Sequence, residues 1–310
     1  MIGFFEEMRL KAVSAGNTVP VDAFTGHVHS VFRRVCNVRL EDNTLVTLLA
    51  HEFGDLPQGI RIQAPGDFTF KESHLYAGQI VVCHAGIVQF AGSPLKVDLQ
   101  KLQLWDAGIK ALTVDITNSR TLQAWEIAWD TLLAFRTPDG LAMLAGPSAV
   151  QAIDLLKSSE TWPLIHRAYP VVRSLVLHSQ LFELDGANRA IGSLIGLGPG
   201  LTPSGDDFLV GFMAGLWSTS GTDRQRRAYI SGFGTRLSTH MQHTTDVSRS
   251  YLRHAAAGRV SATLIALLQA LQSGDDAERI RQITRQALAV GSSSGADTVL
   301  GLLTGLKTWQ

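Results

Sequence analysis

The stretch SGDDFLVGFMAGL at residues 204–216 returns ninety residues later as SGADTVLGLLTGL at residues 294–306. Both follow the pattern S-G-x-D-x-x-x-G-x-x-x-G-L, typical of a turn, an aspartate in the first turn of a helix and two glycines on one helix face. Glycines four residues apart allow a second backbone to approach closely. The alternative is a chance likeness between glycine-rich helices. We expect a duplicated unit whose two helices pair across a local twofold axis at Gly211, Gly215, Gly301 and Gly305.

Hydrophobic periodicity separates the chain into a β-rich part and a helical part. Short apolar runs between Gly, Pro and Asp turns are typical of a small antiparallel barrel or sandwich, and they occupy residues 28–32, 44–49, 60–62, 79–82 and 87–90. Helical periodicity follows at residues 122–135, 148–158, 169–184, 208–217, 224–240, 247–257, 262–271, 277–290 and 298–306. We therefore expect an α+β chain, with a β-rich domain over residues 1–117 and a mainly α-helical domain with an internal repeat over residues 118–310.

The composition excludes several classes of protein. The 310 residues carry 27 Lys and Arg against 27 Asp and Glu, so no excess positive charge is available for nucleic-acid phosphates. Charged residues make up only 17% and hydrophobic residues 45%, which favours burial of part of the surface against other subunits. No apolar run reaches the roughly 18 residues of a membrane helix, and glutamates interrupt the N-terminus where a signal peptide would be apolar. We expect a cytoplasmic protein without membrane or nucleic-acid partners, and buried, reduced thiols at Cys36 and Cys83.

The most unusual segment is the loop GLGPGLTPSGDD at residues 196–207. Its glycines and prolines fix the backbone just before a helix, where free N–H groups and the helix dipole attract anions. It has neither the Gly-Lys-Ser/Thr of a Walker loop nor the spacing of a dinucleotide-binding loop. The loop therefore predicts a site for a phosphate or a carboxylate. The residues expected to bind it, with those of the second repeat copy, are Gly198, Gly200, Thr202, Ser204, Gly205, Ser294 and Gly295.

Three aspartates, Asp206, Asp207 and Asp297, begin the two repeat helices and are the candidate catalytic groups. One role for them is capping of the helix N-termini; the other is contact with substrate, a cation or a catalytic water. If both helix N-termini open onto one cavity, Asp207 and Asp297 should lie on its rim. His240 and His243 have no further ligand at zinc spacing, and no ligand set accompanies the Asp pair, so we expect neither a metal nor a cofactor.

A polar segment, HMQHTTDVSRSYLRH at residues 240–254, interrupts the apolar helical part. Its hydroxyls and one guanidinium are suited to an acidic ligand, and the candidates are Thr244, Thr245, Ser248 and Arg253. The chain has no G-x-S-x-G signature of a Ser/His/Asp triad. Nothing in the sequence therefore offers a covalent nucleophile with its own base.

Three segments resemble a bacterial family long catalogued as a domain of unknown function. They are GLGPGLTPSGDDFLVG (196–211), TTDVSRSYLRHAAAG (244–258) and GSSSGADTVLGLL (291–303). One branch of that family is the small, AllH-type subunit of the oxamate carbamoyltransferase of anaerobic allantoin breakdown. The resemblance covers residues 190–306, whereas the β-rich first third carries no recognised motif. Gly205 stands where some members carry His, and residues 291–294 read GSSS where some members read GHTS.

The resemblance implies an enzyme subunit that works with two larger partner subunits. The implied reaction is oxalurate plus phosphate giving oxamate plus carbamoyl phosphate, so these four anions would be its small-molecule partners. Such a transfer needs an anion site, oxyanion stabilisation and an acid or base, for which the glycine loop, the hydroxyls and Asp207 or Asp297 are suited. Two alternatives stay open. One is a non-catalytic assembly subunit whose glycine helices serve packing, and the other is a metal-dependent hydrolase using the Asp206/Asp207 pair.

Overall fold

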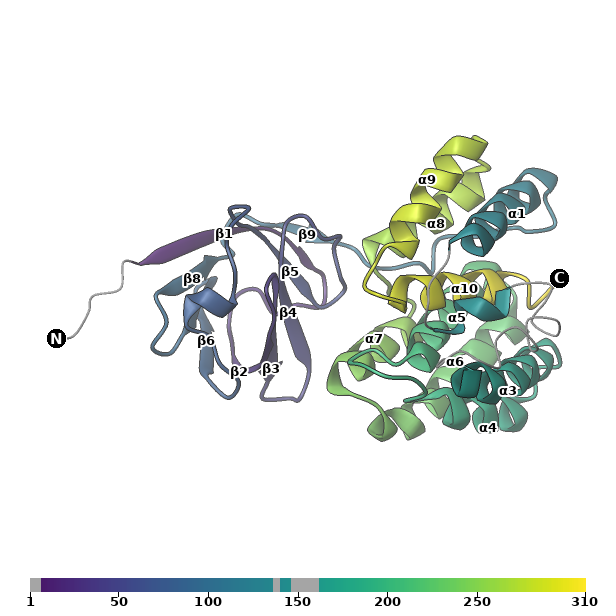
Figure 1. Ribbon diagram of the computed structural model, residues 1–310, viewed down its shortest axis with the longest axis horizontal. Helices are drawn as coiled ribbons and strands as arrows, with labels where there is room; N and C mark the ends of the chain where they lie inside the picture. Colours follow the sequence, from purple (N-terminus) through teal and green to yellow (C-terminus); the bar gives the residue numbers. More distant parts are fainter. Residues whose placement is uncertain (1–6, 136–139, 146–161) are drawn as a thin grey trace. The chain divides into compact units, whose positions relative to one another are not determined.

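The computed structural model describes residues 7–135, 140–145 and 162–310 (Figure 1). The chain divides into two compact units, Met1–Ala107 and Gly108–Gln310. This division lies N-terminal to the boundary expected at residue 117. The helix expected at residues 148–158 lies outside the described residues.

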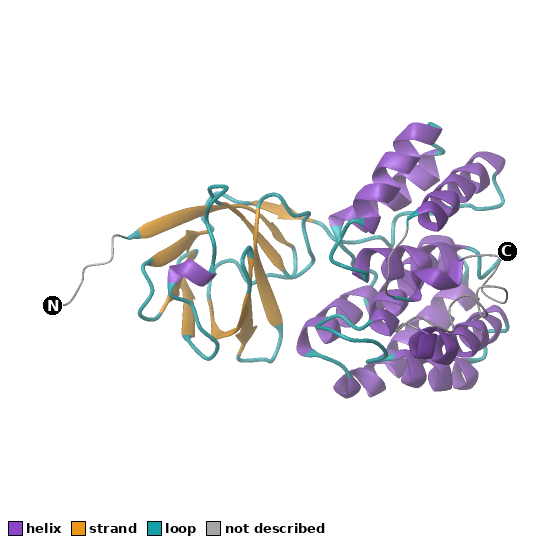
Figure 2. Cartoon of the chain, viewed as in Figure 1, coloured by secondary structure: helices purple, strands orange, loops and turns teal. Residues whose placement is uncertain are grey.

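The first unit is a closed β-barrel (Figure 2). Eight strands follow the order β5-β4-β3-β2-β6-β7-β8-β1, and β1 pairs back onto β5, while β9 extends the sheet beside β1. The expectation of a β-rich barrel is confirmed. The strands are β1 (Met8–Gly16), β2 (Phe24–Val31), β3 (Val35–Leu40), β4 (Leu45–Ala50), β5 (Gly59–Gln63), β6 (Ile80–His84), β7 (Ile87–Phe90), β8 (Leu95–Asp98) and β9 (Gln103–Trp105).

The expectation of an antiparallel sheet is wrong for three strand pairs. β4 pairs with β5, β1 with β8, and β1 with β9 in parallel. Strand β1, which no apolar run predicted, causes two of these pairings, because it is first in the sequence yet lies beside the last strands of the unit. The first half of β1 pairs with β8 and its second half with β9, while its pairing with β5 spans residues 11–15 and has a register shift between Ala12 and Ser14.

Alternating side chains fill the barrel interior. Within β6, Val81 and Cys83 are buried while Ile80 and Val82 are exposed. Cys36 on β3 is also buried, and both cysteines are free thiols, as expected. Burial raises the pKa of Cys36 to about 12 and that of Cys83 to about 11. The thiols are therefore protonated and poor nucleophiles near neutral pH.

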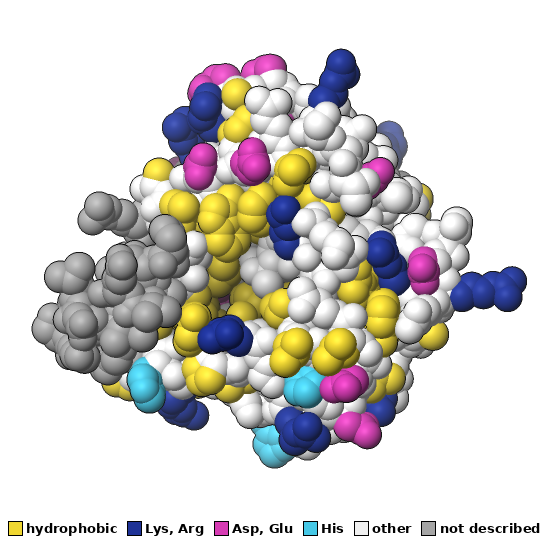
Figure 3. All heavy atoms as spheres, turned by 90° about the vertical axis from the view of Figure 1, so that its right-hand side faces the viewer, with side chains coloured by type: hydrophobic (Ala, Val, Ile, Leu, Met, Phe, Trp, Pro, Cys, Tyr) yellow, Lys and Arg dark blue, Asp and Glu magenta, His cyan; other side chains and the backbone are white. Residues whose placement is uncertain are grey.

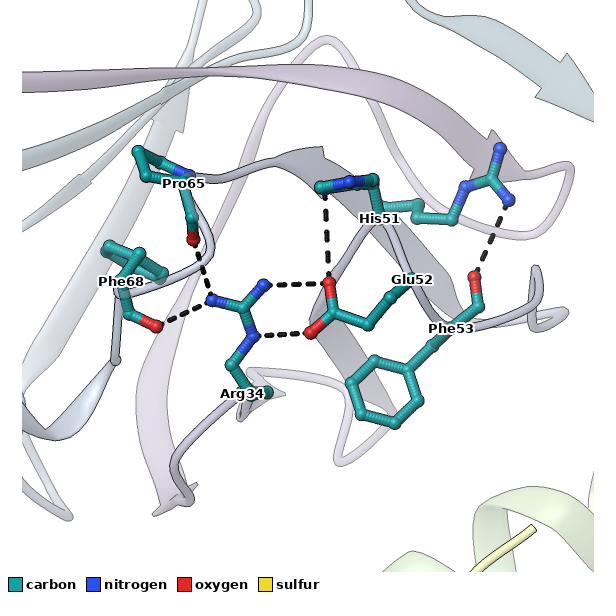
Figure 4. Close-up of polar contacts among 7 residues, drawn as sticks. Arg34, His51, Glu52, Phe53, Pro65 and Phe68 are labelled. Atoms are coloured by element: carbon teal, nitrogen blue, oxygen red, sulfur yellow. Dashed lines mark hydrogen bonds and ion pairs between the residues drawn. The ribbon is translucent and has the colours of Figure 1, made fainter. Parts of the chain in front are cut away.

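One arginine ties three barrel loops together (Figure 4). Arg34, between β2 and β3, forms a two-point ion pair with the carboxylate of Glu52 and donates to the carbonyl oxygens of Pro65 (2.9 Å) and Phe68 (2.6 Å). The Arg34 hydrogen bond lowers the pKa of Glu52. Phe68 in turn packs edge-on against Phe70, with 5.1 Å between the ring centres. All these partners belong to the barrel, so this group of residues stabilises the loops.

The second unit is helical. Within the described residues it contains nine α-helices around one core, together with the short 3-10 helices η2 (Leu141–Ala145) and η3 (Met241–His243). The expected α+β class is confirmed. The helices are α1 (Ser119–Ala134), α3 (Trp162–Gln180), α4 (Leu184–Leu194), α5 (Ser204–Ser220), α6 (Arg224–His240), α7 (Asp246–Ala256), α8 (Ala262–Ser273), α9 (Ala277–Leu288) and α10 (Ser294–Leu306).

The two repeat helices, α5 and α10, are buried over most of their length and form the centre of the helical unit. Both begin at the serine of the repeat, one turn earlier than the apolar periodicity predicted. Helix α4 was not predicted, because glycines are poor helix formers. They are needed there: a Cβ on Gly186 would lie 2.2 Å from the His178 ring, and one on Gly192 would lie 2.8 Å from the His240 ring.

Candidate functional site

The repeat helices α5 and α10 cross at the four glycines that the sequence singled out. A Cβ on any of these glycines would lie 1.9–2.6 Å from a carbonyl oxygen of the other helix. Backbones that approach so closely leave no room for a side chain. The predicted crossing at Gly211, Gly215, Gly301 and Gly305 is confirmed.

The crossing has approximate twofold symmetry. Gly211 faces the carbonyl of Thr298, and Gly301 faces the carbonyl of Phe208, which holds the same position in the other repeat copy. One turn later, Gly215 faces Leu302. Because the contacts advance along both helices in the same direction, the helices run parallel. Their N-termini, each with its Ser-Gly-x-Asp turn, therefore lie at the same end of the pair.

Asp207, in the first turn of α5, is only 7% exposed, and its Oδ2 atom has no hydrogen-bond partner. Removal from water raises the pKa of Asp207 well above its usual value. The hydroxyls of Ser294 and Thr202 lower this pKa, while the nearby charge of Asp297 raises it further. The Asp207 carboxyl therefore keeps its proton to a higher pH than an ordinary aspartate does.

Asp297, in the first turn of α10, holds the equivalent position and is fully buried. Its Oδ1 atom accepts a hydrogen bond from the backbone N–H of Ala142 (2.9 Å), and its Oδ2 atom has no partner. Burial raises the pKa of Asp297 to about 7, although the Ser204 hydroxyl lowers it. A Cβ on Gly140 would lie 2.7 Å from both carboxyl oxygens. The expectation that Asp207 and Asp297 lie on a cavity rim is therefore wrong, because tertiary packing buries both.

Each of these two aspartates interacts with the serine of the other repeat copy. The Ser204 hydroxyl lowers the pKa of Asp297, and the Ser294 hydroxyl lowers that of Asp207. The hydroxyl oxygens of Thr202 and Ser294 lie 2.8 Å apart and link the two repeat loops. Asp207 and Asp297, here called the carboxyl pair, thus lie among four hydroxyls, those of Thr202, Ser204, Ser293 and Ser294. Such a group can hold a proton and pass it on.

Asp206 has different surroundings from Asp207. Its Oδ1 atom accepts a hydrogen bond from the backbone N–H of Gly196 (2.9 Å), and its Oδ2 atom accepts one from the hydroxyl of Thr244. Burial raises the pKa of Asp206, and its bonds to Thr244, Gly196 and Ser248 lower it. Asp206 thus ties the glycine loop to the start of α7. This arrangement does not favour a metal shared by Asp206 and Asp207.

The glycine loop takes its shape from residues with positive φ, between +73° and +118°, a region that favours glycine. These residues are Gly196, Gly198 and Gly200. The N–H groups at the end of the loop are already used: Gly205 donates to the carbonyl of Leu197 (2.8 Å), and the next two residues donate to the carbonyl of Pro203. In the second copy, Gly295 donates to Val290 (2.8 Å). Fewer backbone donors are thus open to an anion than we expected, and the anion cradle stays a prediction.

The hydroxyls of the polar segment 240–254 bind within the protein. Thr245 caps α7 by accepting a hydrogen bond from the N–H of Ser248 (3.1 Å), and its own hydroxyl donates to the carbonyl of Leu201. Thr244 donates to Asp206, and Arg253 is exposed on α7. The threonines and Ser248 therefore position the glycine loop, and their contact with an acidic ligand stays a prediction.

Two residues of the site were not singled out from the sequence. Tyr251 on α7 has its pKa raised to about 12, mainly by burial and also by the charge of Asp207. The sequence could have indicated Tyr251, because it follows Ser248 by three residues and such residues share a helix face. Gly140, which packs on Asp297, left no local signal because the contact joins segments far apart in the chain.

Two of the three histidines of the polar segment, His240 and His243, have separate partners. The His240 ring lies 3.0 Å from the side-chain oxygen of Asn188, and the His243 ring lies 3.1 Å from the amide nitrogen of Gln242. Over residues 7–135, 140–145 and 162–310, no group of three or more His, Cys, Asp or Glu side chains is placed to hold a metal ion. Over the same ranges, no helix has the length and apolar character needed to cross a membrane.

Two family profiles match the chain. Residues 194–306 match the family described as oxamate carbamoyltransferase subunit AllH, and residues 8–104 match the AllH family N-terminal domain. The first match spans α5, the polar segment and α10, and the second spans the barrel. The comparison with solved structures found no match. With both units matched in the expected order, the chain belongs to the AllH family of oxamate carbamoyltransferase subunits.

Proposed function

We propose that this chain is a catalytic subunit of an oxamate carbamoyltransferase and that the carboxyl pair takes part in the transfer. The family match supports the enzyme class. The observation that carries the site is the burial of Asp207 and Asp297, each with one unpartnered oxygen, at the joined N-termini of α5 and α10. The proposed reaction is oxalurate plus phosphate giving oxamate plus carbamoyl phosphate, a step in the breakdown of allantoin and purine nitrogen.

This reaction moves one proton as it moves the carbamoyl group. An oxygen of hydrogen phosphate attacks the carbamoyl carbon of oxalurate, and the bond from that carbon to the amide nitrogen of the oxamate portion breaks. Phosphate loses its proton as the new C–O bond forms, and the leaving nitrogen gains one. A carboxylate that accepts the first proton and a carboxylic acid that supplies the second balance the step.

The carboxyl pair fits this requirement. The pKa of Asp297 is about 7 and that of Asp207 is well above its usual value, so the pair holds a proton near neutral pH. Two carboxyls in one buried site rarely ionise together, which gives one of them the role of acid and the other the role of base. The unpartnered Oδ2 atoms are the positions where substrate would meet the pair. The sequence carries no G-x-S-x-G signature of a covalent nucleophile with its own base, so we favour direct transfer.

Access to the two carboxyls is unequal. Asp207 keeps a small exposed fraction, whereas Asp297 has none and is covered by Gly140 and Ala142. Substrate would therefore meet Asp207 first, and the backbone at residues 140–142 would have to shift before Asp297 is reached. Asp206, Thr244 and the capped start of α7 would hold the glycine loop fixed during that shift.

Exposed apolar side chains beside the repeat loops support a complex with larger subunits. Leu201 lies within the glycine loop and Val290 just before the loop that leads into α10, and they are 46% and 48% exposed. Separately from these two residues, Figure 3 shows hydrophobic side chains gathered around a hollow on the face that lies on the right in Figure 1. Apolar surface of this kind is costly in water and is commonly covered by a partner. We propose that the larger subunits dock beside the repeat loops and complete the active site.

Carbamoyl phosphate formation from oxalurate and phosphate tests this function, first with the chain alone and then with its two larger partners. Asp207→Asn and Asp297→Asn should each lower kcat of the assembled enzyme by about 100-fold or more, the usual contribution of a general acid or base. Arg285→Gln is the matched control, because Arg285 is exposed and pairs only weakly with Glu278 (3.8 Å). Full turnover in both Asn variants would contradict a catalytic role of the carboxyl pair and would favour the alternative of a non-catalytic assembly subunit.

A further inference from the structure

Among the described residues of the helical unit, three buried side-chain nitrogen atoms have no hydrogen-bond partner. They are Nε1 of Trp217 near the end of α5, Nδ1 of His254 on α7, and Nε of Arg259 just after α7. The indole and guanidinium N–H groups can only donate. A buried donor without an acceptor costs about 1–3 kcal/mol. A ligand that accepts hydrogen bonds would remove this cost.

The turn after α7 brings the three residues together. The backbone N–H of Arg259 donates to the carbonyl of His254 (2.9 Å). Between them Gly258, at φ +73°, packs so closely that a Cβ would lie 2.9 Å from the Lys110 side chain and 3.4 Å from the Trp217 indole. The ammonium of Lys110 lies 4.9 Å from the centre of the Trp217 ring. All five residues belong to the helical unit.

This cluster is positively charged. Over the described ranges, none of Lys110, Arg253 and Arg259 forms an ion pair with Asp or Glu. Burial, together with the charges of Arg259 and Arg253, lowers the pKa of His254 to about 4, which places both guanidinium groups near the imidazole. An oxyanion accepts several N–H donors at once and balances such charge.

We propose that Trp217, His254 and Arg259 form a binding site for a small oxyanion, a phosphoryl or carboxylate group, with Lys110 and Arg253 adding positive charge. The indole, imidazole and guanidinium nitrogens hold its oxygen atoms. Trp217 follows Asp207 by ten residues on α5, about 15 Å along the helix axis. The oxyanion site is therefore separate from the carboxyl pair and does not depend on the role proposed for it.

Titration of the full chain with inorganic phosphate and, separately, with oxamate tests this site through the indole ¹⁵N–¹H resonance of Trp217. Trp217→Phe identifies that resonance by its loss. We expect a saturable shift with at least one of the two anions. A shift with phosphate alone identifies a phosphoryl site, and a shift with oxamate alone identifies a carboxylate site. Arg259→Gln should weaken binding by about tenfold or more, which corresponds to the loss of one strong contact, whereas Arg285→Gln should leave it unchanged.

The melting temperature shows whether a variant loses binding only because it is unfolded. Trp217→Phe removes the unsatisfied donor and also part of the indole's volume, so its Tm shows whether the variant is still folded, and it should weaken anion binding measured by calorimetry. No resonance shift with either anion, or equal affinity in the wild type and in folded Arg259→Gln and Trp217→Phe, would overturn the proposal. Because binding is measured without turnover, failure here is distinct from failure of carbamoyl transfer.

Discussion

Replacement of Asp297 by asparagine should change how the stability of the helical unit depends on pH. The wild-type side chain has a pKa of about 7 in the folded protein against an ordinary value of 3.8. At 1.36 kcal/mol for each pH unit, ionised Asp297 costs the folded state about 4 kcal/mol. Folding raises the pKa of Asp297, so the protonated side chain favours the folded state. This contribution to stability is complete below about pH 4 and is lost as the pH rises through 7.

Asparagine removes this dependence because it has no proton to lose. Its Oδ1 atom can still accept the N–H of Ala142, while its amide group adds an unsatisfied donor worth about 1–3 kcal/mol at every pH. The free energy of unfolding of Asp297→Asn, relative to wild type, should therefore rise by about 4 kcal/mol between pH 4 and pH 8. The variant also lacks the Asp297 charge that raises the pKa of Asp207. The loss of this repulsion likewise stabilises the variant relative to wild type at high pH.

Urea denaturation followed by far-ultraviolet circular dichroism measures this difference, because the helical signal comes from the second unit. Asp115→Asn is the control of opposite sign: its hydrogen bonds to Thr117 lower the Asp115 pKa, so its contribution is present above pH 4 and is lost as the pH falls. A difference between wild type and Asp297→Asn that stays constant from pH 4 to pH 8 would refute the assignment of a buried, proton-holding carboxyl.

Three further outcomes follow from the packing. Gly211→Ala should lower the free energy of unfolding in urea by about 3 kcal/mol or more, since its Cβ would lie 1.9 Å from the carbonyl oxygen of Thr298. Gly66→Ala is the control and should cost little, because no atom lies within 4 Å of its Cβ position. Equal losses of stability in the two variants would contradict the crossing. Asp206→Ala should lower Tm by leaving the N–H of Gly196 and the Thr244 hydroxyl without an acceptor, whereas Asp207→Asn should not lower Tm. A lower Tm for Asp207→Asn but not for Asp206→Ala would contradict a structural role for Asp206. Cys36 and Cys83 should resist an aromatic disulfide reagent at pH 8 and react only after unfolding, because burial raises both thiol pKa values; rapid labelling of the folded chain would contradict their burial.

The sequence predicted the centre of the helical unit because glycines four residues apart have a specific physical use. Once the helices pair through Gly211 and Gly301, the twofold relation also decides between the adjacent aspartates. Asp207 is equivalent to Asp297 in the repeat, whereas Asp206 is equivalent to Ala296. Successive residues on a helix point about 100° apart, so only Asp207 can face α10. The sequence alone already carried this distinction.

Other features depend on contacts that local sequence does not record. Strand β1 pairs with strands from the far end of its unit, and α4 contains glycines that only the rings of His178 and His240 explain. The contact between Gly140, just before η2, and Asp297 on α10 joins segments that are far apart in the sequence. The last of these contacts helps to bury Asp297, and burial is the main cause of the raised pKa values of Asp207 and Asp297.

A crystal structure of the chain with oxamate and phosphate tests most directly whether the paired N-termini of α5 and α10 are the reaction site. The account predicts a ligand atom within hydrogen-bond distance, about 3 Å, of the unpartnered Oδ2 atom of Asp207 or Asp297, with the backbone at residues 140–142 displaced. Both anions bound elsewhere at saturating concentration, with Gly140 still packed on Asp297 and Asp207 still covered, would contradict it.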